Sequence, residues 1–556
     1  MARSYCRFVE FTVLLICCGA MACCSAAQRR AKPLVLVEDG RPRAVIVTAD
    51  EPTPVARESA AAMQQIVSQM TGAIVPIQPE SQYEGERVAV LVGGSKLADR
   101  VGTHVQQDRD GEGDRYLIRT GGNYVALVGN DHLELRGTAY AVYDLLQRTG
   151  CGWFGPDPVW HVIPKRKTLA VPPLDIDVRP AFEYRHLWLA QQHKALRDAW
   201  RLGGKAGHTG GPETLFQIVP PEQYRKDHPD YFGKGQPCLT HPDVIDIVTA
   251  DLRARIARQR PHMALLSVGQ MDNENFCECD RCQAVGNVSA RMVHFANRVA
   301  RELDGTNRGQ FTVQFLAHWT VHDPPNPAIK LHPAVSVVMV NEGDHVHPWD
   351  EPEPIEVAET TDRNNTREIT AFAGWRQTGA LEGIWEWWIP ACEDKNWATV
   401  PWYSGQTHLR NLRYWKRGGI RYVFYETNYE RGTGFPLRWP LYYVAARGLW
   451  DTTLTSDQIM TEACNKLYGP AANSMLRFYQ VIEKAMIDSE LTGRNWDLPS
   501  PEAIYTPDIE SRAAEHLVQA AEATSDPAIL ARIADEQEMW NRARDTLTRL
   551  RDASKQ

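Results

Sequence analysis

The chain has 556 residues, of which 43% are hydrophobic and 23% are charged. This composition is typical of a globular protein with about two to four domains, and it excludes a disordered or fibrous chain. The formal net charge of -8 comes without a concentrated basic run, which argues against a nucleic-acid partner because such partners bind a basic face.

Residues 1–27 have the features of an export signal. Two arginines precede an apolar stretch over residues 11–22, which is too short to span a bilayer, and residues 25–27 offer a small-residue cleavage site. Lipid attachment at Cys23 or Cys24 is the alternative. No other run is apolar enough to cross a membrane, so we predict an exported, soluble mature protein, periplasmic or extracellular.

Residues 34–176 are predicted to form a small α/β domain. Apolar runs flank Asp39-Gly40, which is a strong hairpin signal. A helix follows with Pro54 at its first position and Gly72 just beyond its end. The other predicted elements are strands at 88–93, 116–119 and 124–129 and a helix at 137–148. No carboxylates or histidines gather here, so this domain is expected to be accessory to a catalytic one.

Residues 180–450 alternate strand-like apolar runs with helical patterns, as parallel β/α units do. Eight such units predict an α/β fold of the (β/α)₈ TIM type. The alternative, an open doubly wound sheet, lacks its usual glycine-rich loop after the first strand. The predicted strands are 183–188, 204–208, 237–240, 263–269, 311–317, 335–340, 381–385 and 421–425.

Residues 451–556 are predicted to be a helical domain. Met475, Tyr479, Ile482 and Met486 form one apolar stripe at helical spacing. We assign no chemistry to this region.

Polar and charged side chains follow nearly every strand of the predicted barrel. Loops after the strands carry the chemistry of such folds, so these residues predict a carboxylate-lined pocket on one rim. They are Arg185, His208, His241, Asp272, Glu274, His318, Trp319, Glu342, Glu386 and Glu426.

Four cysteines are predicted to come together beside this rim, because the third and fourth strands are neighbours in a barrel. In an oxidising compartment two disulfides are favoured. A Cys₄ zinc site is the alternative, although only the last pair has the usual C-x₂₋₄-C spacing. The cysteines are Cys238, Cys277, Cys279 and Cys282.

Tryptophan is abundant, with 17 residues, and five of them fall in one short stretch. Flat aromatic faces suit the apolar faces of sugar rings, whereas tryptophans that pack in a core are more common. We predict that at least one of the five lines the pocket and stacks on a sugar while the others pack beneath it. The five are Trp385, Trp387, Trp388, Trp397 and Trp402.

Several segments of the chain resemble a family of secreted bacterial proteins catalogued as domain of unknown function 4838. The N-terminal domain is similar to the one that precedes the barrels of β-hexosaminidases and α-glucuronidases, and the resemblance at residues 180–185 implies that Arg185 contacts the sugar. The segments that carry the family resemblance are Gly207-His208-Thr209, His228-Pro229-Asp230-Tyr231-Phe232, Cys238-Leu239-Thr240, Asp272 with Phe276 to Cys282, Trp385-Glu386-Trp387 and Tyr468 to Ala472.

The resemblance departs from glycoside hydrolase family 20 at one position. That family has adjacent Asp and Glu after its fourth strand, whereas this chain has Asp272-Asn273-Glu274, so the substrate-assisted chemistry is not implied. Other barrel glycosidases place the acid after strand four and a partner carboxylate after strand seven. Asp272 or Glu274, paired with Glu386, fits that arrangement.

The sequence therefore predicts a secreted glycoside hydrolase that cleaves an extracellular polysaccharide or oligosaccharide with two carboxylates. Asp272 is the predicted acid and Glu386 its partner, with Glu274, Glu342 and Glu426 as further catalytic candidates. The predicted substrate-binding residues are Arg185, His208, His318, Trp319, Trp385, Trp387 and Glu426.

Two other functions compete with hydrolysis. A non-catalytic glycan-binding protein would keep the tryptophans but would not need opposed carboxylates. A metal-dependent hydrolase would use His208, His241 and His318, which lack a recognised ligand spacing. No cofactor is expected, and the sugar, the stereochemical outcome and the oligomeric state stay open at this point.

Overall fold

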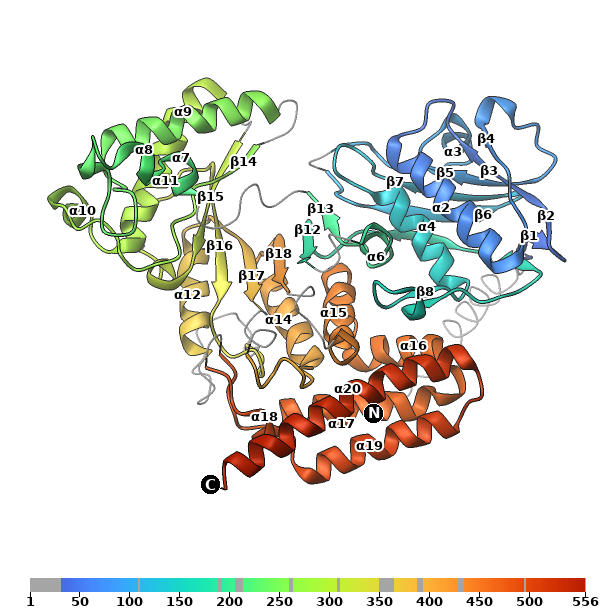
Figure 1. Ribbon diagram of the computed structural model, residues 1–556. Coiled ribbons are helices and arrows are strands. Elements are labelled where there is room, and N and C mark those ends of the chain that lie inside the picture. The colour runs from blue at the N-terminus through green and yellow to red at the C-terminus, as the bar shows by residue number, and fades with distance from the viewer. Residues whose placement is uncertain are drawn as a thin grey trace, which may run out of the picture.

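Figure 1 shows the computed structural model of the chain. It describes residues 32–108, 111–188, 193–205, 214–259, 264–307, 311–349, 365–387, 394–427, 435–494 and 497–555.

The N-terminal region contains a six-stranded mixed sheet and a smaller three-stranded one. Helices α2 (Pro54–Thr71) and α4 (Gly137–Arg148) pack together against the larger sheet. Its strand order is β11 (Asp175–Val178), β6 (Tyr116–Gly121), β7 (Tyr124–Gly129), β5 (Val88–Val92), β3 (Ala44–Thr48) and β4 (Ile77–Pro79), and the smaller sheet has the order β10 (Leu169–Val171), β1 (Leu34–Glu38) and β2 (Arg41–Pro42).

The turn and cap signals in this region act as predicted. Asp39 and Gly40 both have positive φ, of 48° and 76°, and join β1 to β2 in an antiparallel hairpin. Thr53 caps α2 by accepting a hydrogen bond from the backbone N–H of Ala56, and Gly72 ends the helix in the left-handed conformation that glycine adopts without strain. The second apolar run, β3, leaves the hairpin and joins the larger sheet.

The central region is built on a seven-stranded sheet whose six long strands run parallel. Trp188, after β12, and Gln270, after β14, come from opposite ends of the sheet and line the same pocket, so the sheet curls. Its order is β13 (Gly203–Gly204), β12 (Tyr184–Leu187), β18 (Tyr422–Glu426), β17 (Leu381–Trp387), β16 (Val335–Asn341), β15 (Phe311–Ala317) and β14 (Ala264–Ser267).

The closed eight-stranded barrel that the sequence predicted is not confirmed. The second predicted strand is the two-residue β13, which pairs antiparallel and whose glycines have φ of 119° and 103°. The third, residues 237–240, forms no strand, because Pro237 has no N–H to donate and the N–H of Cys238 bonds locally to Tyr231 O. Within the described residues the curled sheet is therefore open between β13 and β14.

Helices cover the outer side of this sheet and form the C-terminal region (Figure 1). One continuous apolar core runs through all these parts of the molecule. None of the helices in the described ranges is long and apolar enough to cross a membrane. The helices of the central region are α6 (Lys194–Ala199), α7 (Leu215–Ile218), α8 (Pro221–Tyr224), α9 (Pro242–Gln259), α10 (Asp280–Val285), α11 (Val288–Asn307), α12 (Thr366–Gln377), α14 (Gly405–Arg417) and α15 (Phe435–Trp450), and those of the C-terminal region are α16 (Ser456–Tyr468), α17 (Ala472–Ile487), α18 (Pro501–Ile504), α19 (Pro507–Glu522) and α20 (Pro527–Ala553).

Arg185 connects the N-terminal region to the sheet, and this placement corrects its predicted role as a sugar contact. Its side chain is fully buried and forms an ion pair with the buried Asp114 at 2.6 Å. It also donates to the carbonyl oxygen of Arg201 and lies over the ring of Trp450, 5.1 Å from its centroid. Arg185 is adjacent to His186 in β12, so the two side chains point to opposite faces of the strand.

Candidate active site

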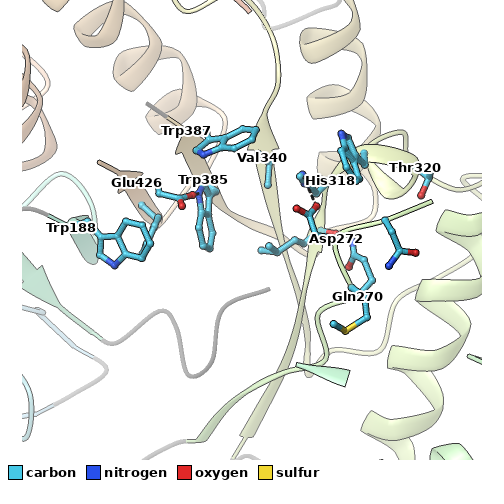
Figure 2. A pocket seen from close by; sticks show the side chains of 14 residues that line it. Trp188, Gln270, Asp272, His318, Thr320, Val340, Trp385, Trp387 and Glu426 are labelled. Carbon is cyan, nitrogen blue, oxygen red and sulfur yellow. Dashed lines mark hydrogen bonds and ion pairs between the residues drawn. The ribbon is translucent and has the colours of Figure 1, made fainter. Parts of the chain in front are cut away.

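A pocket of about 390 Å³ lies at the carboxyl ends of the parallel strands. Side chains alternate across a strand, so the pocket receives every second residue from the strands beneath it, such as Trp385 and Trp387 from β17. Its lining residues are Trp188, Gln270, Met271, Asp272, Asn273, Leu316, His318, Trp319, Thr320, Val340, Trp385, Trp387, Phe424 and Glu426 (Figure 2).

Aromatic rings make up much of this lining. Trp385 and Trp387 both face the pocket, which confirms that part of the tryptophan prediction. Trp397 and Trp402 are buried elsewhere and pack against each other at 4.8 Å. Trp388 lies outside the described residues. Stacking on a sugar stays a prediction.

Trp188 and Phe424 line the pocket but were absent from the predicted site. Trp188 is 44% exposed and directly follows β12. Period-two alternation would have found both: Trp188 shares a face with His186, and Phe424 shares one with Glu426. The ring of His186 stacks on Phe424 at 4.1 Å beneath the pocket.

Asp272, His318 and Glu342 form a chain of polar side chains at one side of the pocket. His318 Nε2 lies 3.9 Å from an Asp272 oxygen, and His318 Nδ1 lies 3.9 Å from a Glu342 oxygen. Burial lowers the pKa of His318 to about 4, so its ring is neutral at pH 7. Burial raises the pKa of Glu342, whose side chain is 8% exposed.

The backbone of Trp319 is strained, and its N–H group contacts Glu342. Its φ of 52° is in the left-handed region, which a bulky residue rarely adopts. In that conformation its backbone N–H donates to Glu342 Oε1 at 2.6 Å, and its ring stays 41% exposed in the pocket.

Glu426 is the second carboxylate of the pocket. It ends β18, is half-buried, and accepts a hydrogen bond of 2.7 Å from the indole N–H of Trp385. Asp272 reaches the pocket from the loop after β14, and its side chain is 57% exposed. Figure 2 shows Glu426 on the Trp385 side of the pocket and Asp272 on the His318 side.

Glu386 does not face the pocket, and the predicted pairing of Asp272 with Glu386 is therefore wrong. It is fully buried and accepts hydrogen bonds from His345 at 2.7 Å and Asn341 at 2.8 Å. Although burial acts to raise its pKa, His345 and His408 together lower it below the ordinary value of 4.5. The reason is alternation: Trp385 and Trp387 face the pocket, so Glu386 faces the surrounding helices.

The remaining predicted residues lie away from the pocket or outside the described residues. Glu274 is exposed and is not among the lining residues. His241 pairs with Asp230 at 2.9 Å. His208 lies outside the described residues, so the histidine metal triad stays a hypothesis.

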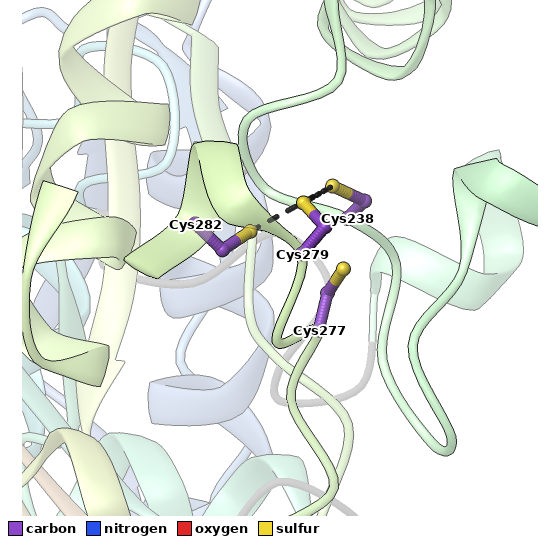
Figure 3. Close-up of side chains that lie close together, drawn as sticks. All are labelled: Cys238, Cys277, Cys279 and Cys282. Atoms are coloured by element: carbon purple, nitrogen blue, oxygen red, sulfur yellow. Dashed lines mark hydrogen bonds between the residues drawn. The ribbon is translucent and has the colours of Figure 1, made fainter. Parts of the chain in front are cut away.

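The four cysteines converge as predicted, but they form no disulfides. Cys238, Cys277, Cys279 and Cys282 are free thiols, and their sulfur atoms all lie within 4.8 Å of one another (Figure 3). The Sγ of Cys238 is 3.8 Å from that of Cys279 and 3.7 Å from that of Cys282. A disulfide needs about 2.05 Å, so the predicted pairing is wrong.

The site therefore consists of aromatic rings and carboxylates at the carboxyl ends of the parallel strands of a curled sheet. A family model described as "Domain of unknown function (DUF4838)" matches residues 156–480. The chain therefore belongs to this family.

Comparison with solved structures finds a protein of similar fold. The chain is similar to a structure described as a novel family GH115 4-O-methyl-α-glucuronidase with specificity for decorated arabinogalactans. The TM-score is 0.60 at 13% sequence identity, and the match covers 92% of this chain and 73% of the other. No curated protein sequence matches the chain.

Proposed function

We propose that the protein is a glycoside hydrolase that cleaves an extracellular polysaccharide or oligosaccharide. The observation that carries the proposal is the pocket itself, in which Asp272 and Glu426 lie on different sides among tryptophan side chains (Figure 2). Glycosidic bond cleavage uses one carboxylic acid and one carboxylate on either side of the scissile bond. Glu426 takes the place that the sequence prediction gave to Glu386.

Glu426 is proposed as the nucleophile or base. The indole N–H of Trp385 donates to its Oε2 atom, and a hydrogen bond to the charged form of a carboxylate favours ionisation. Trp385 also keeps the carboxylate oriented toward the pocket, as a residue that attacks or activates water at a fixed point requires.

Asp272 is proposed as the general acid. Its side chain is solvent-exposed in the free protein, and a sugar stacked against Trp319 would displace that water. Desolvation raises the pKa of a carboxyl group, so substrate binding favours the protonated form that donates to the leaving oxygen. The neutral His318 ring adds no positive charge that would oppose this.

The test is turnover on a glycan panel that includes neutral polysaccharides and arabinogalactan with 4-O-methylglucuronic acid branches. Asp272→Asn and Glu426→Gln are expected to lose about 100- to 10,000-fold in turnover, as removal of an acid or base does. Glu274→Gln is the matched control, because this exposed carboxylate lies two residues from Asp272 and outside the pocket lining. Near-normal turnover of the two pocket variants would overturn the assignment.

A glycan-binding protein without turnover is the second candidate, and the aromatic lining favours it as much as it favours hydrolysis. Binding of a glycan by the wild type, without cleavage of any member of the panel, would establish it.

Export is proposed on the sequence of residues 1–27, which lie outside the described residues. Intact mass of protein recovered from the cell exterior or periplasm is expected to correspond to a chain that begins near Gln28. Retention of the full leader in the cytoplasm would refute export.

A further inference from the structure

Two separate segments bring the four cysteines together (Figure 3). Cys238 lies in the turn that follows the bridge between Phe232 and Pro237. Cys277, Cys279 and Cys282 come from the loop that leads into α10 and from its first turn. Among the cysteine, histidine and acidic side chains of the described residues, these four cysteines form a group whose ligand atoms lie close enough together to hold a metal ion.

The spacing of the sulfur atoms matches the edges of a metal-thiolate tetrahedron. With Zn–S bonds of about 2.3 Å, adjacent sulfur atoms of a tetrahedral site lie about 3.8 Å apart. The two measured separations from Cys238 are 3.7 Å and 3.8 Å.

A hydroxyl group lies beside the sulfur atoms. The Thr240 Oγ1 is 3.1 Å from the Cys282 sulfur and 3.6 Å from the Cys238 sulfur. A hydroxyl that donates to a thiolate stabilises its negative charge and orients it as a metal ligand.

We propose that Cys238, Cys277, Cys279 and Cys282 bind one Zn²⁺ ion as a structural site. Three of the four side chains are buried, and the fourth is half-buried. Four thiolates complete the tetrahedral coordination of zinc and leave no open position for a substrate or water, which is typical of a structural site.

The zinc site holds the loop that carries Asp272. Gln236, two residues before Cys238, donates to Met271 O at 2.6 Å and accepts from Met271 N at 2.9 Å. Asn273 donates to Gly235 O at 2.9 Å. A metal ion bound by the four cysteines would connect the segment around residue 238 to the segment 277–282. It would thereby fix the position of Asp272 without lining the pocket. The inference does not depend on sugar hydrolysis.

The test is metal content of the purified full-length protein, measured by inductively coupled plasma mass spectrometry. We expect one zinc per chain in the wild type and in Cys464→Ala, the control for a buried cysteine outside the cluster. We expect almost none in the double variant Cys277→Ala/Cys282→Ala. A stoichiometric metal in that variant would overturn the site.

A second measurement uses only the wild type, so it does not depend on the folding of a variant. Exchange of the metal for Co²⁺ is expected to give the visible absorption bands of tetrahedral cobalt with thiolate-to-metal charge transfer. A wild type without metal, whether its four thiols titrate freely or its mass shows two disulfides, would overturn the proposal. Stoichiometric iron in place of zinc would also overturn it.

Discussion

Replacement of Glu386 by glutamine tests whether this carboxylate contributes to stability or to catalysis. The side chain is fully buried on the face of β17 opposite Trp385 and Trp387. It accepts hydrogen bonds from Asn341 and His345. Glutamine has nearly the same shape, so the pocket is expected to keep its form. The substitution removes the negative charge that faces His345 and His408.

The expected loss of stability follows from the bonds that change. The glutamine carbonyl can still accept from Asn341, so the net loss is the charge-assisted bond to His345. A hydrogen bond to a charged group contributes about 1.5–3 kcal/mol. For a cooperative unit of several hundred residues, a loss of about 2 kcal/mol corresponds to a melting temperature about 2–4 °C lower.

The assay combines thermal unfolding with steady-state kinetics on the same preparation. Glu386→Gln is expected to melt earlier while its turnover at 25 °C stays within a few-fold of wild type. The pKa of Glu386 is lowered in the folded protein, so its contribution is present above the unfolded pKa and is lost as the pH falls through the folded value, below 4.5. The variant should lack this acid dependence. An unchanged melting temperature with turnover lost by orders of magnitude would refute the reasoning.

Three further predictions concern other parts of the molecule. Burial raises the pKa of Glu536 to about 8. The free energy of unfolding should therefore fall by up to about 1.4 kcal/mol per pH unit as the pH rises from 4.5 to about 8. Urea unfolding of Glu536→Gln at several pH values should show a weaker dependence of this free energy on pH. A Cβ at Gly233 would lie 2.6 Å from the backbone nitrogen of Cys277, so Gly233→Ala should speed zinc release to a chelator, whereas Gly94→Ala, which has open space, should not. Trp385→Phe removes the donor to Glu426 and should raise the lower pKa of the pH–activity profile; an unshifted profile would show that the bond does not tune Glu426.

The strands beneath the pocket could be predicted from the sequence because they are continuous apolar runs. Residues 311–317 were predicted as a strand and form β15 with the same bounds. The strand predicted at residues 237–240 does not form. Pro237 has no N–H group to pair in a central sheet, and the N–H of Cys238 bonds to the nearby Tyr231 carbonyl. The curl of the sheet depends on contacts between distant segments, which no local pattern encodes.

The candidate site was predicted in its composition but not in its orientation. Asp272, His318 and Trp319 follow strands and line the pocket, as strand-end residues do in this type of fold. The roles predicted for Glu386 and Arg185 were wrong for the same reason. Each lies next to residues whose side chains face the inside of the curl, and neighbours along a strand point to opposite faces. The Trp-Glu-Trp pattern carried that information, because two tryptophans in the pocket exclude the glutamate between them.

The buried ion pair between Arg185 and Asp114 has a consequence for how this protein can be divided. The two charges lie 71 residues apart in the chain, and neither side chain is exposed to water. Replacement of Asp114 by alanine in the intact chain would leave the Arg185 guanidinium buried without its counterion, which costs about 3–5 kcal/mol. The N-terminal region therefore stabilises the central sheet through this ion pair. A chimera between relatives would have to keep Asp114 and Arg185 together.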